Sequence, residues 1–364
     1  MTRSLFAPVS FACGVAAPNA FALAPLTNGQ SHDDGTLGDD ERRWLVRRAA
    51  GGFGLVSTCA AHVSEDGKGF DGQLGVWGDR HLPGLTTLAS ELRAQGAVAV
   101  VQLYHGGARC PSRLTGAQPW SASAFTENKP DFEVPRAATD DDIARVIQHF
   151  GDAAARCAKA GFDGVELHGA HGYLFSQFLS ATMNTRADAW GGSLENRARL
   201  LREATRAARA RGGARFVVGV RLSPEDFGFT RGVDLDETVQ VARWLADDGA
   251  DFVHLSLWDV NRMTKKRPDE HPIAVFRAAL PDRVRIVVAG KVWARADAER
   301  CLSLGADLVA FGRAAIVNPD LPTQCRDEAW SPRRPPLTPE EYAARDVSPA
   351  FVGYLRRFEG MVAG

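Results

Sequence analysis

Short apolar runs alternate with longer amphipathic stretches along most of the chain. Each run is rich in Val, Leu, Ala, Ile or Phe and predicts a buried strand. The eight predicted strands are Phe21–Ala24, Gly54–Cys59, Val98–Leu103, Gly164–Leu167, Phe216–Leu222, Phe252–Leu257, Arg285–Ala289 and Leu308–Phe311. Apolar residues at helical spacing predict helices over Asp39–Ala50, Leu85–Gln95, Asp140–Ala160, Leu194–Arg211, Leu235–Asp248, Pro272–Leu280 and Ala294–Leu304.

The same three-residue pattern precedes three of the strands. Gly161-Phe-Asp163, Gly249-Ala-Asp251 and Gly305-Ala-Asp307 each follow a predicted helix. A glycine just past a helix supplies the left-handed residue that ends it. Apolar strands separated by helices indicate a parallel sheet buried on both faces. An open doubly wound sheet could carry this pattern, but eight such units favour a closed (β/α)₈ TIM barrel.

Length alone would suggest about two domains. Because the eight units take up most of the 364 residues, we expect one domain over residues 1–364, with residues 335–364 as a C-terminal extension. The apolar first 25 residues could be a signal peptide, but Pro8, Asn19 and Pro25 interrupt them. We expect residues 1–20 to form a β-hairpin lid, around Leu5 to Val15, that leads into the first strand.

Charge and cysteine content exclude several classes of protein. The 43 basic and 44 acidic residues give a net charge of −1, which argues against a nucleic-acid partner. No apolar stretch is long enough to span a membrane. The six cysteines are scattered, which disfavours structural zinc, an iron–sulfur cluster and a disulfide framework, so we expect no metal and a cytoplasmic location.

The loops that follow the barrel strands are expected to carry the chemistry. Gly290-Lys291 follows the seventh strand and Gly312-Arg313 follows the eighth, where barrels commonly bind phosphate. The alternative is that these glycines only form turns and that the two cations are solvated.

The fourth strand ends in His168-Gly-Ala-His171-Gly-Tyr173. Two imidazoles and a phenol offer hydrogen-bond donors and a possible proton donor. A metal site would need a third ligand, which no Asp or Glu supplies at the usual spacing, and buried structural histidines are the other alternative. Gln102 and Arg221 lie on the third and fifth strands, where an amide and a guanidinium would suit a polar ring system.

Together these residues resemble the Old Yellow Enzyme family of FMN-dependent ene reductases. The strongest segment runs from Phe162 to Leu179 and continues through Asn184-Thr-Arg186 to Trp190-Gly-Gly-Ser-Leu-Glu-Asn-Arg197. The resemblance implies that NADPH or NADH is the reductant and that the activated C=C bond of an α,β-unsaturated carbonyl or nitro compound is reduced. The substrate would be a small molecule, and the enzyme could be a homo-oligomer such as a dimer.

The resemblance also implies roles for particular residues. His168 and His171 would bind the activating oxygen of the substrate, and Tyr173 would donate the proton. The implied flavin contacts are Pro25, Thr27, Ala60, Gln102 and Arg221, with Gly290, Lys291, Gly312 and Arg313 at the phosphate.

Departures from the family pattern keep two other functions open. Asn28-Gly29 follows Thr27 where some relatives have an aromatic residue, which suggests a more open pocket. Together with Asp226 and Asp259, this leaves room for an FMN-dependent amine or N-methyl dehydrogenase. A more remote alternative is a flavin-free phosphate-binding lyase that uses Lys291 for Schiff-base chemistry.

Two basic segments each allow two interpretations. Lys265-Lys266-Arg267 could attract the 2′-phosphate of NADPH, or could simply be solvated. Tyr354 and Arg356-Arg357 could reach a neighbouring subunit's active site, as C-terminal tails do in some relatives, or could belong to an ordinary amphipathic segment.

Overall fold

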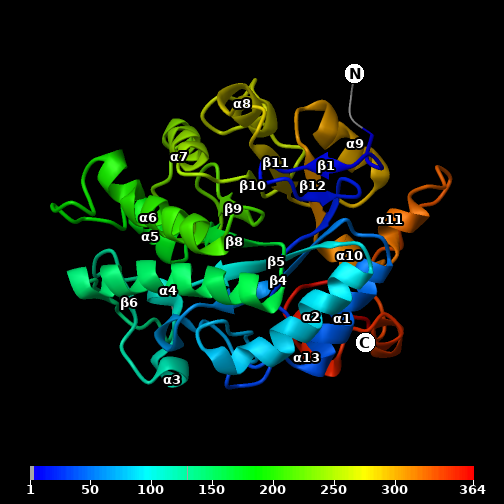
Figure 1. The fold of residues 1–364 in the computed structure, drawn as a ribbon, viewed down its shortest axis with the longest axis horizontal. Helices are drawn as coiled ribbons and strands as arrows, with labels where there is room; N and C mark the ends of the chain where they lie inside the picture. The colour runs from blue at the N-terminus through cyan, green and yellow to red at the C-terminus, as the bar shows by residue number, and fades with distance from the viewer. Residues whose placement is uncertain (1–3, 129) are drawn as a thin grey trace.

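The computed structural model describes residues 4–128 and 130–364 and confirms the predicted TIM barrel (Figure 1). Eight parallel strands close in the order β10-β11-β12-β3-β4-β5-β8-β9. Their bounds are β3 Phe21–Leu23, β4 Leu55–His62, β5 Val98–Tyr104, β8 Gly164–Gly169, β9 Val217–Leu222, β10 Phe252–Ser256, β11 Arg285–Ala289 and β12 Leu308–Phe311. Each corresponds to a predicted strand.

Helices surround the strands and bury their apolar faces against them (Figure 1). The outer helices are α1 Asp39–Ala50, α2 Leu82–Ala94, α4 Asp140–Ala160, α6 Leu194–Gly212, α7 Leu235–Asp247, α8 Pro272–Ala279 and α9 Arg295–Ser303. The predicted start of α2 at Leu85 is wrong by three residues. Pro83 lies in the first turn of this helix, where its missing N–H costs nothing, so the helix begins earlier.

The recurring aspartates connect neighbouring strands at the N-terminal end of the barrel. Asp163 Oδ2 accepts the backbone N–H of Ala99 at 2.9 Å. Asp251 Oδ2 accepts that of Val218 at 2.9 Å, and Asp307 Oδ2 accepts that of Ile286 at 3.0 Å. Each carboxylate therefore fixes the start of the strand beside it, which explains why the pattern recurs.

A short hairpin contacts the same end of the barrel. Strands β1 Val9–Ser10 and β2 Ala16–Ala17 are antiparallel, and Val9 pairs with Ala17. The Phe11 ring lies 5.9 Å from that of Phe252, and the Cys13 N–H donates to Asp251 Oδ1 at 3.2 Å. The hairpin thus lies opposite the strand ends that carry the candidate chemistry.

The loops at the C-terminal ends of the strands carry further short elements. These are η1 Glu65–Gly67, η2 Asp79–His81, η3 Gly107–Arg109, α3 Ser112–Thr115, β6 Trp120–Ser121, β7 Arg136–Ala137, α5 Leu174–Leu179, α10 Arg313–Val317, α11 Leu321–Gln324, α12 Pro339–Ala343 and α13 Pro349–Leu355. Helix α13 contacts α1, where the ring of Phe351 meets that of Trp44 edge-on at 5.5 Å.

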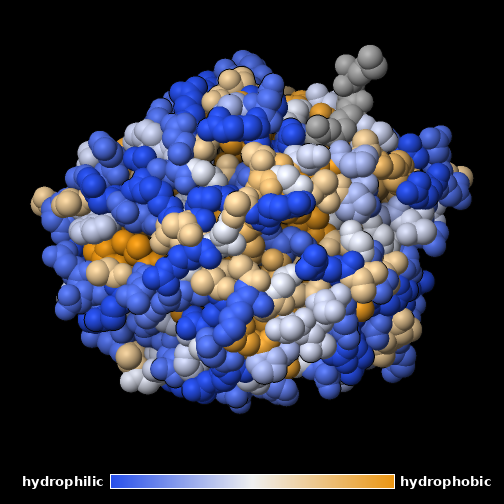
Figure 2. All heavy atoms as spheres, viewed as in Figure 1, coloured by the Kyte–Doolittle hydropathy of each residue, from blue (hydrophilic) through white to orange (hydrophobic). Residues whose placement is uncertain are grey.

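The surface in Figure 2 is mostly hydrophilic, with apolar residues in small separate groups. In the part of the chain that the structure describes, each helix is too short or too polar to cross a bilayer.

Candidate active site

The register of the barrel strands places the predicted site residues around one end of the barrel. Ala60 on β4 is opposite Gln102 on β5. His168 on β8 is opposite Arg221 on β9. Gln102, His168 and Arg221 are all buried, so the barrel holds an amide, an imidazole and a guanidinium close to one another.

Gly172 and the two residues beside it form a tight turn that brings His171 and Tyr173 back toward His168. The His168 ring lies 4.9 Å from the His171 ring and 5.0 Å from the Tyr173 ring. His171 has φ 63°, a left-handed conformation that is uncommon outside glycine.

Three contacts hold His171 in this conformation. Its N–H donates to Ser223 Oγ at 3.2 Å, and its carbonyl accepts from Arg109 at 2.9 Å. Its Nε2 lies 2.6 Å from Ser256 Oγ. The ring is therefore fixed both through its backbone and through its side chain.

Both histidines of the candidate site are neutral at physiological pH. Burial, followed by the nearby His171 and Arg221, holds the pKa of His168 well below its ordinary value. Burial and Arg221 do the same to the pKa of His171. Ala170 donates its N–H to His168 Nδ1 at 3.4 Å, so the neutral His168 ring carries its proton on Nε2. This nitrogen can donate to a bound oxygen.

Tyr173 contacts two residues that the sequence did not single out. Its ring meets Tyr104 edge-on at 4.6 Å, and the Arg109 guanidinium lies 4.5 Å from its ring centroid. Arg109 also lies 4.1 Å from the ring of Phe229 and so fills the space between two aromatic rings. The residues at the strand ends do not reveal Arg109, because Arg109 lies in a short 3₁₀ turn within a long loop.

The C-terminal helix reaches the site of its own chain. Burial raises the pKa of Tyr354, and a hydrogen bond with the Thr27 side chain opposes this shift. Tyr173, Arg357 and Arg109 are the next groups that affect the pKa of Tyr354, and the Arg357 guanidinium lies 5.6 Å from the centroid of its ring. Tyr354 thus contacts the active site without a neighbouring subunit, while Arg356 donates to the Gly364 carbonyl at 2.9 Å.

The two predicted phosphate loops leave the adjacent strands β11 and β12, whose Val288 and Val309 pair. A Cβ added at Gly290 would lie 2.3 Å from the Leu257 carbonyl oxygen, so only glycine fits there. A Cβ at Gly312 would meet only Leu26 Cδ2 at 3.6 Å, which leaves the backbone of this loop open.

The cations of these loops contact side chains of neighbouring segments. Lys291 Nζ lies 3.5 Å from Asp259 and 5.8 Å from the ring centroid of Trp258. Arg313 lies 5.4 Å from the ring of Phe358. Both side chains are exposed at the barrel mouth and accessible to an anion.

An open cavity of about 310 Å³ lies between the loops that follow β9 and β10. It adjoins the histidine pair, because Ser256 lines it and the Phe227 ring lies 6.3 Å from that of His171. Trp258 and Met263 form its outer part, and the rings of Phe227 and Trp258 are 5.9 Å apart. This space is large enough for a small organic molecule.

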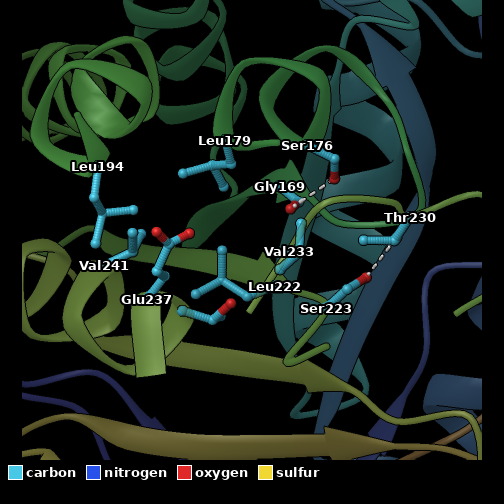
Figure 3. Close-up of a pocket in the computed structure, with 11 residues that line it drawn as sticks. Gly169, Ser176, Leu179, Leu194, Leu222, Ser223, Thr230, Val233, Glu237 and Val241 are labelled. Atoms are coloured by element: carbon cyan, nitrogen blue, oxygen red, sulfur yellow. Dashed lines mark hydrogen bonds between the residues drawn. The ribbon is translucent and has the colours of Figure 1, made fainter. Parts of the chain in front are cut away.

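A second void lies behind the barrel wall, among β9, α5, α6 and α7 (Figure 3). It leaves about 10 Å³, room for at most one water. Ser176 points to the Gly169 carbonyl and Thr230 points to Ser223, which in turn accepts from the His171 N–H (Figure 3). These residues support the site from outside the barrel.

In the basic segment at residues 265–267, Lys266 and Arg267 pair with acidic side chains, and Lys265 Nζ donates to the Asp226 backbone carbonyl. Lys266 Nζ lies 2.7 Å from carboxylate oxygens of both Asp234 and Asp236. Arg267 pairs with Asp236 and with Glu270. These contacts fit a solvated structural role, and a 2′-phosphate would have to compete with them.

The chain belongs to the NADH:flavin oxidoreductase / NADH oxidase family, whose pattern matches residues 4–329. It is an NAD(P)H-dependent flavin oxidoreductase with FMN as its cofactor, as the resemblance to the Old Yellow Enzyme family implied.

Several curated proteins are similar over most of the chain. A probable NADH-dependent flavin oxidoreductase YqiG of Bacillus subtilis is 37% identical over 87% of this chain and 86% of its own length. An NADPH dehydrogenase of Bacillus licheniformis is 34% identical over 88% of this chain and 93% of its own length. An NADH:fumarate oxidoreductase of Klebsiella pneumoniae is 34% identical over 86% of this chain, but this match spans only 35% of that longer protein.

Solved structures show the same fold. The Old Yellow Enzyme homologue from Zymomonas mobilis superimposes with a TM-score of 0.82 at 30% identity, covering 95% of this chain and 99% of that chain. Morphinone reductase in complex with tetrahydroNAD superimposes with a TM-score of 0.82 at 28% identity, covering 93% of this chain and 94% of that chain.

The polar groups at the barrel mouth fit FMN. The Nε of Arg221 is buried and has no hydrogen-bond partner within the described residues, so it is available to a polar ring. The open Gly312 backbone and the exposed Arg313 offer N–H donors to a phosphate. These two donor sets match the two polar ends of a flavin mononucleotide.

Proposed function

We propose that this enzyme uses NAD(P)H to reduce the activated C=C bond of α,β-unsaturated carbonyl or nitro compounds. The observation that carries this proposal is the pair of neutral imidazoles, in which the buried His168 ring lies 4.9 Å from the partly exposed His171 ring and 5.0 Å from the Tyr173 ring. Such a pair can donate hydrogen bonds to an oxygen that gains negative charge, while a phenol supplies a proton.

In this proposal each side chain has one task. Bound FMN supplies the hydride chemistry. His168 and His171 bind the substrate oxygen and stabilise its developing charge. Tyr173 gives its phenolic proton to the α-carbon, and Arg109 holds the Tyr173 ring in place through their stacking contact.

The proposed FMN contacts follow the two donor sets of the barrel mouth. Pro25, Thr27 and Ala60 would lie around the isoalloxazine, Gln102 would bind its pyrimidine edge, and Arg221 would stabilise the negative charge of the reduced ring. The phosphate would be bound by the loops of the seventh and eighth strands, through Gly290, Lys291, Gly312 and Arg313.

The assignment of Tyr173 is tested by separating the two half-reactions. The enzyme is reduced anaerobically and mixed with cyclohexenone in a stopped-flow instrument. We expect Tyr173→Phe to slow flavin reoxidation by at least about a hundredfold, the usual contribution of a general acid. Reduction by NADPH should keep its rate.

Tyr342→Phe is the matched control, because this buried phenol donates to the Met361 carbonyl at 2.7 Å, outside the site. Its reoxidation rate should equal that of the parent enzyme. Full reoxidation activity of Tyr173→Phe would remove Tyr173 from the mechanism.

The structure gives no support to the amine dehydrogenase. The Asp226 carboxylate accepts the backbone N–H groups of Gly232 and Val233 at 2.9 and 2.7 Å. Asp259 pairs with Lys291 and accepts from Asn261 at 2.9 Å. Both carboxylates are therefore occupied, rather than free to bind an amine.

The lyase alternative needs a desolvated Lys291, since a Schiff-base lysine must lose its proton easily. The Lys291 side chain is 54% exposed and its Nζ lies 3.5 Å from Asp259, so it is neither desolvated nor free of a partner. This arrangement does not favour Schiff-base chemistry.

A cytoplasmic location and a homodimer remain predictions from the sequence. Cell fractionation checks the first, and light scattering of the holoenzyme after size-exclusion chromatography checks the second.

A further inference from the structure

Two titratable side chains lie inside the barrel, within strands rather than at their ends. Glu166 on β8 and His254 on β10 are each 1% exposed. Their Oε2 and Nδ1 atoms are 2.7 Å apart. Barrel interiors are usually filled by branched apolar residues, and a buried charge is costly, so this pair calls for an explanation.

The His254 ring is the donor in this contact. A carboxylate has only acceptor atoms, so Nδ1 carries the proton. The Nε2 of His254 is buried without a hydrogen-bond partner among the described residues, and burial lowers the pKa of His254. The ring is therefore neutral and holds one oxygen of Glu166.

The other oxygen of Glu166 holds the amide of Gln102. Gln102 Nε2 donates to Glu166 Oε1 at 2.6 Å. Because the carboxylate accepts only from the NH₂ group, this bond decides which way the amide faces. The Gln102 carbonyl is thus directed away from Glu166 and is available to an N–H donor.

Glu166 also acts on Arg221. Burial raises the pKa of Glu166, but His254, Arg221 and Gln102 together outweigh burial and leave it below its ordinary value. Glu166 is in turn the main group that opposes the lowering of the Arg221 pKa by burial. The negative charge of the Glu166 carboxylate and the positive charge of the Arg221 guanidinium thus stabilise each other beneath the candidate flavin site.

We propose that Glu166, held by His254, is a positioning residue for the flavin, with two effects. It turns the Gln102 carbonyl toward the N3–H edge of the pyrimidine ring, and it offsets part of the Arg221 charge, which lowers the reduction potential of bound FMN. This inference rests on the proposed placement of the pyrimidine ring at Gln102 and Arg221.

The central test is Glu166→Gln, which keeps the shape of the side chain and removes its charge. The midpoint potential of FMN in the holoenzyme is measured by equilibration with redox dyes. We expect the variant to bind reduced FMN more tightly, relative to oxidised FMN, by at least about tenfold. For a two-electron couple this is a positive shift of about 30 mV.

Glu237→Gln is the matched control for removal of a carboxylate. Glu237 pairs with Arg197 at 2.6 Å and lines the small void outside the barrel wall. It should leave the potential unchanged, even if it lowers the melting temperature. A purely structural role for Glu166 predicts the same behaviour as this control, and that result would overturn the inference.

A second pair of variants tests whether the hydrogen bond from His254 keeps Glu166 in position. His254→Leu removes the donor and should shift the potential in the same direction as Glu166→Gln. His254→Asn offers a side-chain N–H near the position of Nδ1 and should restore the potential of the parent enzyme. If Glu166→Gln does not fold, this pair decides the matter, and equal potentials for both His254 variants would overturn the inference.

Gln102→Leu distinguishes failure of this inference from failure of the proposed placement. It should weaken FMN binding, as judged by fluorescence on release of the flavin. Unchanged FMN affinity in Gln102→Leu would refute the placement itself. Weakened affinity in Gln102→Leu, with an unshifted potential in Glu166→Gln, would refute only the role of Glu166.

Discussion

His171 combines a proposed catalytic role with an unfavourable backbone conformation. A left-handed residue other than glycine costs about 1 to 3 kcal/mol, and it persists only where surrounding contacts hold it. Ser223, Arg109 and Ser256 provide those contacts. The orientation of the imidazole therefore depends on residues that need not touch the substrate.

Ser256 offers a direct test of that dependence. Its Oγ lies 2.6 Å from His171 Nε2 and accepts from Arg221 Nη2 at 3.1 Å. A neutral hydrogen bond contributes about 0.5 to 1.5 kcal/mol, so we expect Ser256→Ala to slow enone reduction by about three- to tenfold. Stopped-flow reoxidation with cyclohexenone measures this change.

Ser303→Ala serves as the control, since Ser303 is exposed at the end of α9. The proposed role of Ser256 is refuted if both serine variants reoxidise at the parent rate.

At the residue scale, the sequence indicates the site only where its side chains lie at strand ends. His168, His171, Tyr173, Gln102 and Arg221 could be located this way. Glu166 and His254 could not be paired beforehand, because their contact crosses β9 and exists only when the barrel closes. Arg109 comes from a loop whose path no periodicity predicts. Tyr354 is a candidate from the sequence, but only the path of the C-terminal helix shows that it lies near the site of its own chain.

At the scale of elements, the aspartates before β8, β10 and β12 connect each strand to its neighbour. Asp163 is a suitable case, since its Oδ2 accepts from Ala99 and burial raises its pKa. Asp163→Ala leaves this buried N–H without its acceptor. We expect a loss of about 1 to 3 kcal/mol in the free energy of unfolding, measured by urea denaturation.

Asp269→Ala removes an exposed carboxylate from a loop and should change stability by less than about 0.5 kcal/mol. Equal stability of the Asp163 and Asp269 variants would show that the recurring aspartates do not stabilise the strands.

Most elements of the barrel could be predicted, and the differences have local causes. Strand β4 extends beyond the predicted Cys59 to His62, because its register shifts between Ser57 and Ala60 and pairing with β5 then resumes. Such a bulge depends on the partner strand rather than on apolar periodicity. The long loops hold short strands and helices that carry too little periodicity to be recognised.

At the scale of the whole molecule, buried neutral histidines make stability depend on pH. Burial lowers the pKa of His62 and of His81 to about 4. The unfolded chain, in which histidine titrates near 6.5, binds more protons than the native state below that pH. The contribution of these two histidines to the free energy of unfolding is therefore fully present above about pH 6.5 and is lost as the pH falls toward 4.

When the pH falls from 7.5 to 5, we expect each of these two histidines to lower the free energy of unfolding by about 2 kcal/mol. Urea denaturation at the two pH values measures the loss. His62→Asn should reduce it, whereas the exposed His32→Asn should not. A loss that is the same in His62→Asn and in the parent would contradict the assignment.

The β1–β2 hairpin at the N-terminal end of the barrel determines how the enzyme can be attached to a surface. All six cysteines are free, and Cys13 in the hairpin turn is the one that is partly exposed, while the other five are buried. A maleimide-coated electrode would therefore capture the protein through Cys13, with the flavin end facing the solution. Because burial raises the pKa of this thiol, coupling should be faster in mildly alkaline buffer.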